Sequence, residues 1–207
     1  MATTLYIPIR PEIHFVSQHS FTAEEVRLGY APNRNDWQTV ISDSKVFAKL
    51  LRKRQLIAFG AYGAVYDVKG TAIKIGCIGE SEPSIQQWVY ERYQRALPVW
   101  AFSQAVTLPK AITHEVCPRH GYLSELWTSS SVVCHCGEPM AVLVMPVADR
   151  ADQSADRNER IGDQIYEAVF KKFEICLDLH KNNYVEFKGR LMLCDFGDPN
   201  DRVADYW

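Results

Sequence analysis

The sequence has no long apolar run and no basic leader. Its longest apolar stretch, Ala141 to Ala148, is far shorter than the roughly 20 residues that span a bilayer. The first residues lack the basic segment followed by an apolar stretch that marks a secretory leader. We therefore expect a soluble protein of the cytoplasm with no membrane partner.

The sequence also lacks an excess of charge of one sign. It has 23 basic and 25 acidic residues. A balanced charge does not attract nucleic acid or an anionic membrane at long range, so we do not expect a nucleic-acid partner. Six cysteines are present, but without a secretory leader they do not predict a disulfide framework.

Apolar residues make up 47% of the 207 positions, which is enough for a core. Their periodicity predicts an α+β fold. Helices are expected over 36–54, 81–96 and 161–177, and strands over 55–59, 64–68, 71–76, 141–145, 184–187 and 191–194. The sequence divides into an N-terminal strap and helix (1–54), a β-rich part (55–148) with a Cys/His insert at about 114–140, and a last part (149–207).

A glycine-bearing hairpin precedes a lysine in an apolar strand. Gly60 and Gly63 lie between two expected strands, where small residues let backbone amides approach a phosphate. Lys74 lies between Ile73 and Ile75, and burying a lysine is unfavourable unless it meets an anion. If each feature is considered alone, the glycines could belong to an ordinary hairpin, and Lys74 could lie harmlessly on an edge strand.

The helix expected after this strand supplies acidic candidates to hold Lys74. We expect Glu91 to form the ion pair, and we regard Gln87 and Glu82 as less suitable. The alternative interpretation of Glu91 is a solvated helix face.

Polar oxygen ligands flank the last expected hairpin. Asp178 and Asn183 precede it, and Asp195 follows it. Carboxylate and amide oxygens that converge across a hairpin are the hard ligands that Mg²⁺ prefers. Each of these residues alone is ordinary, since Asp is common at helix ends and Asn in turns.

In combination, these strings resemble the signature motifs of protein kinases. Ile57 to Val65 is similar to the glycine loop, with Ala58 in place of the first glycine; Ala72-Ile73-Lys74 is similar to the lysine motif, and Asp195-Phe196-Gly197 to the metal-binding motif. Asp178 lies five residues before Asn183, as the Asp and Asn of the kinase catalytic loop do. The Asp-x-His-x-x-Asn form of this loop is most similar to small-molecule phosphotransferases and to the small early Ser/Thr protein kinases of short-tailed bacteriophages.

The resemblance implies a protein-kinase-like two-lobed fold with a β-rich N-lobe and a strongly reduced C-lobe. It implies ATP and Mg²⁺ as cofactors, with Lys74 and Asp178 as catalytic residues and Asn183 and Asp195 as the Mg²⁺ ligands. Met145 would be the gatekeeper, and the Val147 backbone would lie beside the adenine. The implied nucleotide-binding positions are Ala58, Gly60, Gly63, Val65, Lys74, Glu91, Met145, Val147, Asn183 and Asp195.

The function implied by the resemblance is transfer of the γ-phosphate to Ser or Thr of host proteins, in the host cytoplasm if a phage encodes the chain. Only ten residues follow Gly197, where larger kinases carry helices that bind the substrate, so the acceptor is not indicated. A small-molecule phosphotransferase and a non-catalytic kinase-like protein that inhibits a host factor are the alternatives.

The insert carries two close pairs of metal-ligand residues, each pair followed by glycine. These residues are Cys117, His120, Cys134 and Cys136. Thiolate and imidazole ligands in tight turns suit a tetrahedral Zn²⁺, which would be structural here. His114 or His135 is an alternative fourth ligand, and free thiols in an ordinary insert are the alternative to zinc.

Overall fold

The computed structural model describes residues 21–60, 63–76, 78–104, 141–151, 155–177, 179 and 183–196. Over these residues the protein is a mixed α+β structure with a five-stranded antiparallel sheet and a three-stranded sheet. The α+β prediction is therefore confirmed. None of the described helices is both long and apolar enough to cross a membrane.

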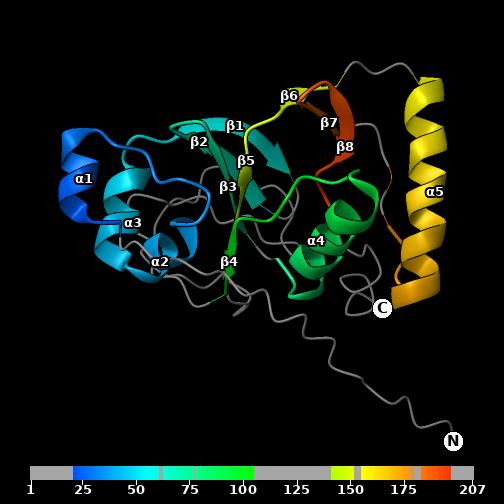
Figure 1. Cartoon of the computed structure of the whole chain (residues 1–207), viewed down its shortest axis with the longest axis horizontal. Coiled ribbons are helices and arrows are strands. Elements are labelled where there is room, and N and C mark those ends of the chain that lie inside the picture. The colour runs from blue at the N-terminus through cyan, green and yellow to red at the C-terminus, as the bar shows by residue number, and fades with distance from the viewer. Residues whose placement is uncertain are drawn as a thin grey trace, which may run out of the picture.

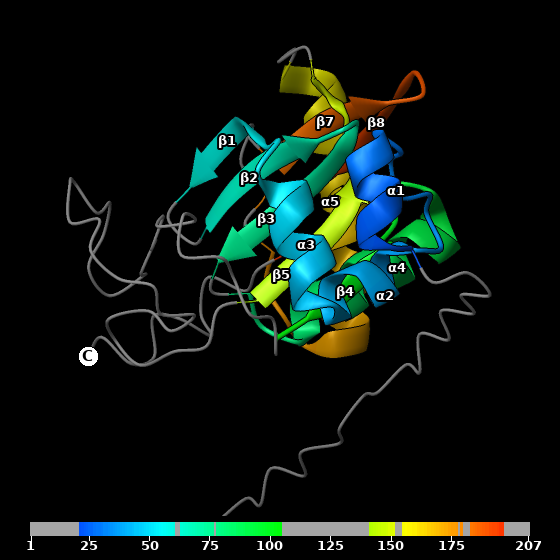
Figure 2. The ribbon, with the colours of Figure 1, turned by 90° about the vertical axis from the view of Figure 1, so that its left-hand side faces the viewer.

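Three short helices cover one face of the large sheet (Figure 2). They are α1 (Ala23–Leu28), α2 (Trp37–Ser42) and α3 (Ser44–Leu51). The single helix expected over 36–54 is wrong, because the chain is extended at Asp43. The Asp43 side chain accepts hydrogen bonds from the backbone N–H groups of Lys45 and Val46, so this residue ends α2 and caps α3.

The large sheet has the strand order β1-β2-β3-β5-β4. Its strands are β1 (Gln55–Gly60), β2 (Gly63–Val68), β3 (Thr71–Gly76), β4 (Ala101–Ser103) and β5 (Ala141–Pro146). Lys69 and Gly70, which join β2 to β3, both have positive φ, as a tight two-residue hairpin turn requires. A Cβ at Gly63 would lie 2.6 Å from the Ile75 carbonyl oxygen, so glycine permits the close approach of β2 and β3.

The remaining elements lie on the other side of this sheet (Figure 1). They are α4 (Ser81–Tyr93), α5 (Ala155–Phe173) and a small sheet of β6 (Asp149–Arg150), β7 (Tyr184–Phe187) and β8 (Arg190–Leu193). Both helices end earlier than expected, at residues followed by left-handed backbone: Gln94 after α4 and Glu174 after α5. The end of α5 at Phe173 places the helix terminus five residues before Asp178.

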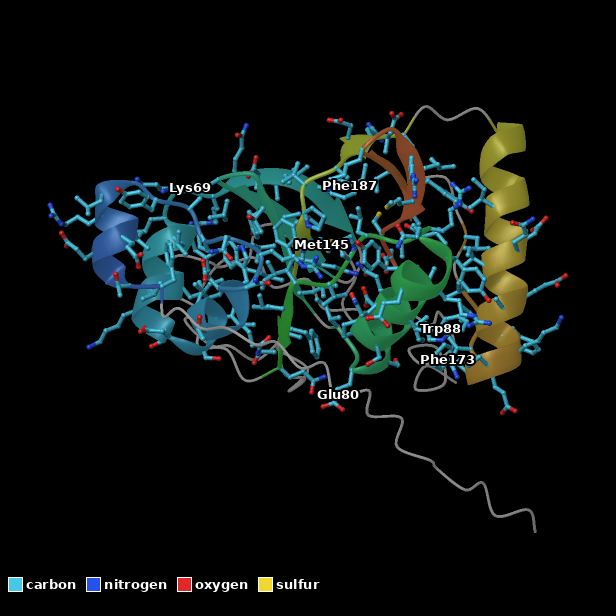
Figure 3. All side chains as sticks on the ribbon, viewed as in Figure 1. Lys69, Glu80, Trp88, Met145, Phe173 and Phe187 are labelled. Atoms are coloured by element: carbon cyan, nitrogen blue, oxygen red, sulfur yellow. The ribbon has the colours of Figure 1, made fainter. Side chains whose placement is uncertain are left out.

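Strand β3 separates two apolar clusters. Ile73 and Ile75 pack with α1–α3, together with Trp37 and Phe47. Alternation along the strand therefore turns Lys74 to the opposite face, toward α4 and the small sheet. On that side, α4, α5, β7 and β8 share a second cluster. Its aromatic members Trp88 and Phe173 meet edge to face between α4 and α5 (Figure 3).

Candidate functional site

Lys74 lies at the centre of the candidate site. It is only 6% exposed, on a strand that pairs with β2 on one side and β5 on the other. Its Nζ lies 2.5 Å from a carboxylate oxygen of Glu82 and 3.2 Å from one of Asp195. Lys74 is therefore not on an edge strand, and α4, β3 and the segment after β8 meet at its ammonium group.

The two carboxylates keep Lys74 charged. Burial by itself lowers the pKa of a lysine, because it removes water from the ammonium group. The negative charges of Asp195 and Glu82 outweigh that effect and raise the pKa of Lys74 above its ordinary value of 10.5. The group is a buried cation at neutral pH.

The expectation that Glu91 holds Lys74 is wrong, because Glu82 does so. Glu91 is exposed, and its carboxylate accepts a hydrogen bond from Gln87 Nε2. Helix α4 begins at Ser81, soon after β3 ends at Gly76, so its first turn is the part nearest Lys74. Nine residues of helix carry Glu91 about 13 Å farther along the axis. The early start of the helix was the signal in the sequence that favoured Glu82.

The small sheet brings Asn183 and Asp195 to the same end of one hairpin. Tyr184 pairs with Leu193, and the next backbone N–H, that of Cys194, donates to the Asn183 carbonyl oxygen at 3.0 Å. Asn183 is 6% exposed, while Asp195 is partly exposed and contacts Lys74. The two predicted metal ligands, Asn183 and Asp195, therefore lie close together, near the buried Lys74.

Cys194, between these residues, has an unreactive thiol. Burial, together with the carboxylate of Asp195, raises the pKa of Cys194 to about 12, although Lys74 opposes the shift. Its Sγ donates a weak hydrogen bond to the Asn183 carbonyl oxygen at 3.4 Å. The thiol supports the turn rather than supplying a nucleophile.

An apolar cluster extends from Lys74 toward the chain that joins the two sheets. Ala72 pairs with Met145 across β3 and β5, and both are buried. Figure 3 labels Met145 on β5. Half-buried members of the same cluster come from β2, the segment after β5, and β7: Val65, Val147, Ala148, Val185 and Phe187. The predicted residues Val65, Met145 and Val147 are thus brought together, and Ala72 and Val185 are members that the motifs did not single out.

A β-bulge shapes the edge of this cluster. Leu56 pairs with Tyr66 and Ala58 pairs with Val65, so Ile57 is the extra residue of β1. In such a bulge, two residues of one strand oppose a single partner, the extra residue is left unpaired and the strand bends. Ile57 is 46% exposed, and its neighbour Ala58, which pairs with Val65, is exposed as well. Gly60 ends β1 and pairs with Gly63.

Several predicted site residues lie outside the described part of the chain. They are Asp178 and the zinc candidates Cys117, His120, Cys134 and Cys136. Their roles stay predictions. Comparison of the chain with protein-family models gives no match, and comparison with curated proteins gives none either.

Proposed function

We propose that this protein is an ATP- and Mg²⁺-dependent kinase of the protein-kinase-like two-lobed type, with a β-rich N-lobe and a reduced C-lobe. The observation that carries the proposal is the buried Lys74 ammonium, which lies between Glu82 of α4 and Asp195 after β8. In protein kinases, a lysine of the third strand pairs with a glutamate of the helix that follows and lies near the metal-binding aspartate.

The charges at Lys74 favour a phosphate site over a simple structural ion pair. A buried ion pair needs one carboxylate for one ammonium group, and extra buried charge is destabilising. Here Lys74 contacts two carboxylates, that of Glu82, which is buried, and that of Asp195, which is partly exposed. The partly exposed carboxylate of Asp195 is open to a divalent cation, which would bring phosphate groups next to Lys74.

The donor set fits Mg²⁺. Asp195 offers carboxylate oxygens and Asn183 an amide oxygen, and both are the hard ligands of a site that keeps several water molecules. Bound Mg²⁺ would neutralise charge on the phosphate oxygens. Lys74 would hold the phosphates through its N–H groups, and Glu82 would fix the direction of the lysine side chain. Asp178 is proposed to orient the acceptor hydroxyl group and accept its proton.

The apolar cluster beside Lys74 fits a planar base. Val65 and Ala72 come from the large sheet and Val185 from the small sheet, and Val147 lies in the chain between them. Half-buried apolar side chains from two sides, with backbone polar groups between them, are typical of sites for flat aromatic ligands. We propose that adenine binds here, with Ile57 on its outer side.

Labelled ATP incubated with the full chain and a bacterial lysate tests the proposed transfer. Labelled proteins with phosphoserine or phosphothreonine would support a Ser/Thr protein kinase acting on host proteins. A labelled metabolite would favour a small-molecule phosphotransferase. Loss of all transfer, with MgATP binding retained, would favour a non-catalytic binding protein.

Asp178→Asn is the matched control for that experiment. It keeps the size of the side chain and removes its capacity to accept a proton, so transfer should fall by about 10²-fold or more while MgATP affinity stays near that of the parent. Transfer at the parent rate would contradict the role assigned to Asp178.

A further inference from the structure

Gln86 is a polar side chain in a position where an apolar one would be expected. It lies in the middle of α4 and is 0% exposed. Its Nε2 donates to the Leu97 carbonyl oxygen at 2.9 Å and lies 4.0 Å from the Met145 sulfur. Its Oε1 has no hydrogen-bond partner within the part of the chain that the structure describes. A buried amide oxygen without a partner is destabilising, so packing alone does not explain this residue.

The carbonyl group that Gln86 contacts belongs to a segment that runs along β8. Ala96 forms a parallel bridge with Leu193. The Leu97 N–H donates to the Leu193 carbonyl oxygen at 3.0 Å, and the Leu193 N–H donates to the Arg95 carbonyl oxygen at 2.8 Å. Residues 95–97 therefore act as an additional strand beside β8, which we name the connecting strand.

These contacts form a closed ring with the ion pairs of Lys74. Gln86 lies one helical turn after Glu82 on α4, and Asp195 lies two residues after Leu193. Glu82 and Asp195 both contact Lys74. The ring thus runs from Lys74 through α4, the connecting strand and β8, and back to Lys74. A shift of α4 along the connecting strand would change the distance between the two carboxylates.

We propose that Gln86 is a positioning residue, which couples helix α4 to β8 so that Glu82 and Asp195 meet Lys74 together. The coupling rests on the proposed function in so far as it prepares Lys74 and Asp195 for a nucleotide. It assigns a role to a side chain that touches neither the phosphate nor the base. In this account, the buried amide sets the relative position of the two elements that carry the charged groups.

Gln87 provides the matched control. Its Oε1 accepts a hydrogen bond from the Val99 N–H at 2.9 Å, so it also joins α4 to the chain after it. Val99 lies two residues beyond Leu97, past the contact with Leu193. If the glutamines only hold α4 to the following segment, Gln86→Met and Gln87→Met should behave alike.

Hydrogen exchange of the Leu193 amide in the full chain, followed by NMR, tests the coupling without nucleotide. We expect Gln86→Met to speed this exchange about tenfold and Gln87→Met to leave it near the parent rate, because only Gln86 bonds to Leu97, whose N–H donates to the Leu193 carbonyl oxygen. We expect the MgATP dissociation constant to rise about tenfold in Gln86→Met alone. Thermal midpoints without nucleotide should be similar in the two variants.

Unchanged Leu193 exchange in Gln86→Met, or an equal increase in both variants, would overturn the coupling. A parent that does not bind MgATP would overturn the proposed function, while faster Leu193 exchange in Gln86→Met alone would still support the coupling. If Gln86→Met does not fold, the parent supplies the test. In the parent, the hydrogen-exchange rates of the Gln86 side-chain amide and of the Leu193 backbone amide should depend on urea concentration in the same way. Different urea dependences of the two rates would refute the inference.

Discussion

The ammonium group of Lys74 lies 2.5 Å from a carboxylate oxygen of Glu82, and both side chains are buried. Because Glu82 belongs to the first turn of α4, this one contact fixes the start of the helix against the central strand of the large sheet. A carboxylate oxygen of Asp195 lies 3.2 Å from the same ammonium group. The candidate site is thus built where three separate segments meet at one cation.

Glu82→Gln removes one of the two charges that hold Lys74. We expect it to lower the free energy of unfolding by roughly 2–4 kcal/mol, since a buried cation then has a single, partly exposed carboxylate partner. Glu91→Gln is the control on the same helix, and it should change stability by less than about 0.5 kcal/mol because Glu91 is exposed. Urea unfolding of the parent and both variants makes the comparison. Equal effects of the two substitutions would contradict the assignment of Glu82.

Lys74→Met gives a prediction on pH. The folded-state pKa of Lys74 is raised, so its contribution to stability is fully present below the unfolded value of 10.5 and is lost as pH rises through the folded pKa. The stability difference between the parent and Lys74→Met should therefore stay constant between about pH 7 and about pH 10, and decrease only above that range. Urea unfolding at several pH values measures it. A difference that stays constant as the pH rises above about 11 would show that the pKa of Lys74 is not raised.

The strand pattern around this site was predictable from the sequence, and its helix ends were not. The strands at 64–68, 71–76 and 184–187 follow local alternation and tight Lys-Gly turns, which depend on few residues. The division at Asp43 depends on a side chain that accepts hydrogen bonds from the next turn while apolar spacing continues on both sides. Periodicity alone does not reveal such a break.

The ion-pair partner of Lys74 was mispredicted for a related reason. Sequence order placed both Glu82 and Glu91 on the helix after β3, and the expected start of that helix at Ser81 favoured Glu82, but the contact itself depends on how the helix lies against the strand in space. The bulge at Ile57 and the connecting strand beside β8 are likewise products of tertiary pairing. The sequence indicates which residue types form the site, but their contacts follow only from the three-dimensional fold.

Ile57 and Leu56 form a matched pair for testing the base site. Both are about half exposed, but Leu56 pairs with Tyr66, whereas Ile57 is the extra residue of the bulge and is proposed to lie on the outer side of the base. Ile57→Ser should raise the MgATP dissociation constant about tenfold, because an apolar side chain no longer covers the base. Leu56→Ser should leave it unchanged. Equal affinities in the two variants, measured by calorimetry, would mean that the base does not lie against this face.

Gly162 of α5 lies directly beside Tyr184, the first residue of the β7–β8 hairpin, which follows Asn183. A Cβ at this position would overlap the hydroxyl oxygen of Tyr184, which is buried beside α5. Gly162→Ala should therefore destabilise the protein by about 1–3 kcal/mol through overpacking and weaken MgATP binding. Adding Tyr184→Phe removes the overlapping oxygen, so the double variant should regain most of both losses. No recovery in thermal midpoint or affinity would show that the two residues are not in contact.

The most direct test of the central claim is calorimetric titration of MgATP into the full-length parent, Lys74→Met and Asp195→Asn. The account predicts that the parent binds ATP in a Mg²⁺-dependent manner and that both variants, while still folded, bind at least tenfold more weakly, because each loses a charged group of the site. A parent that binds no nucleotide, or folded variants that bind as tightly as the parent, would contradict it.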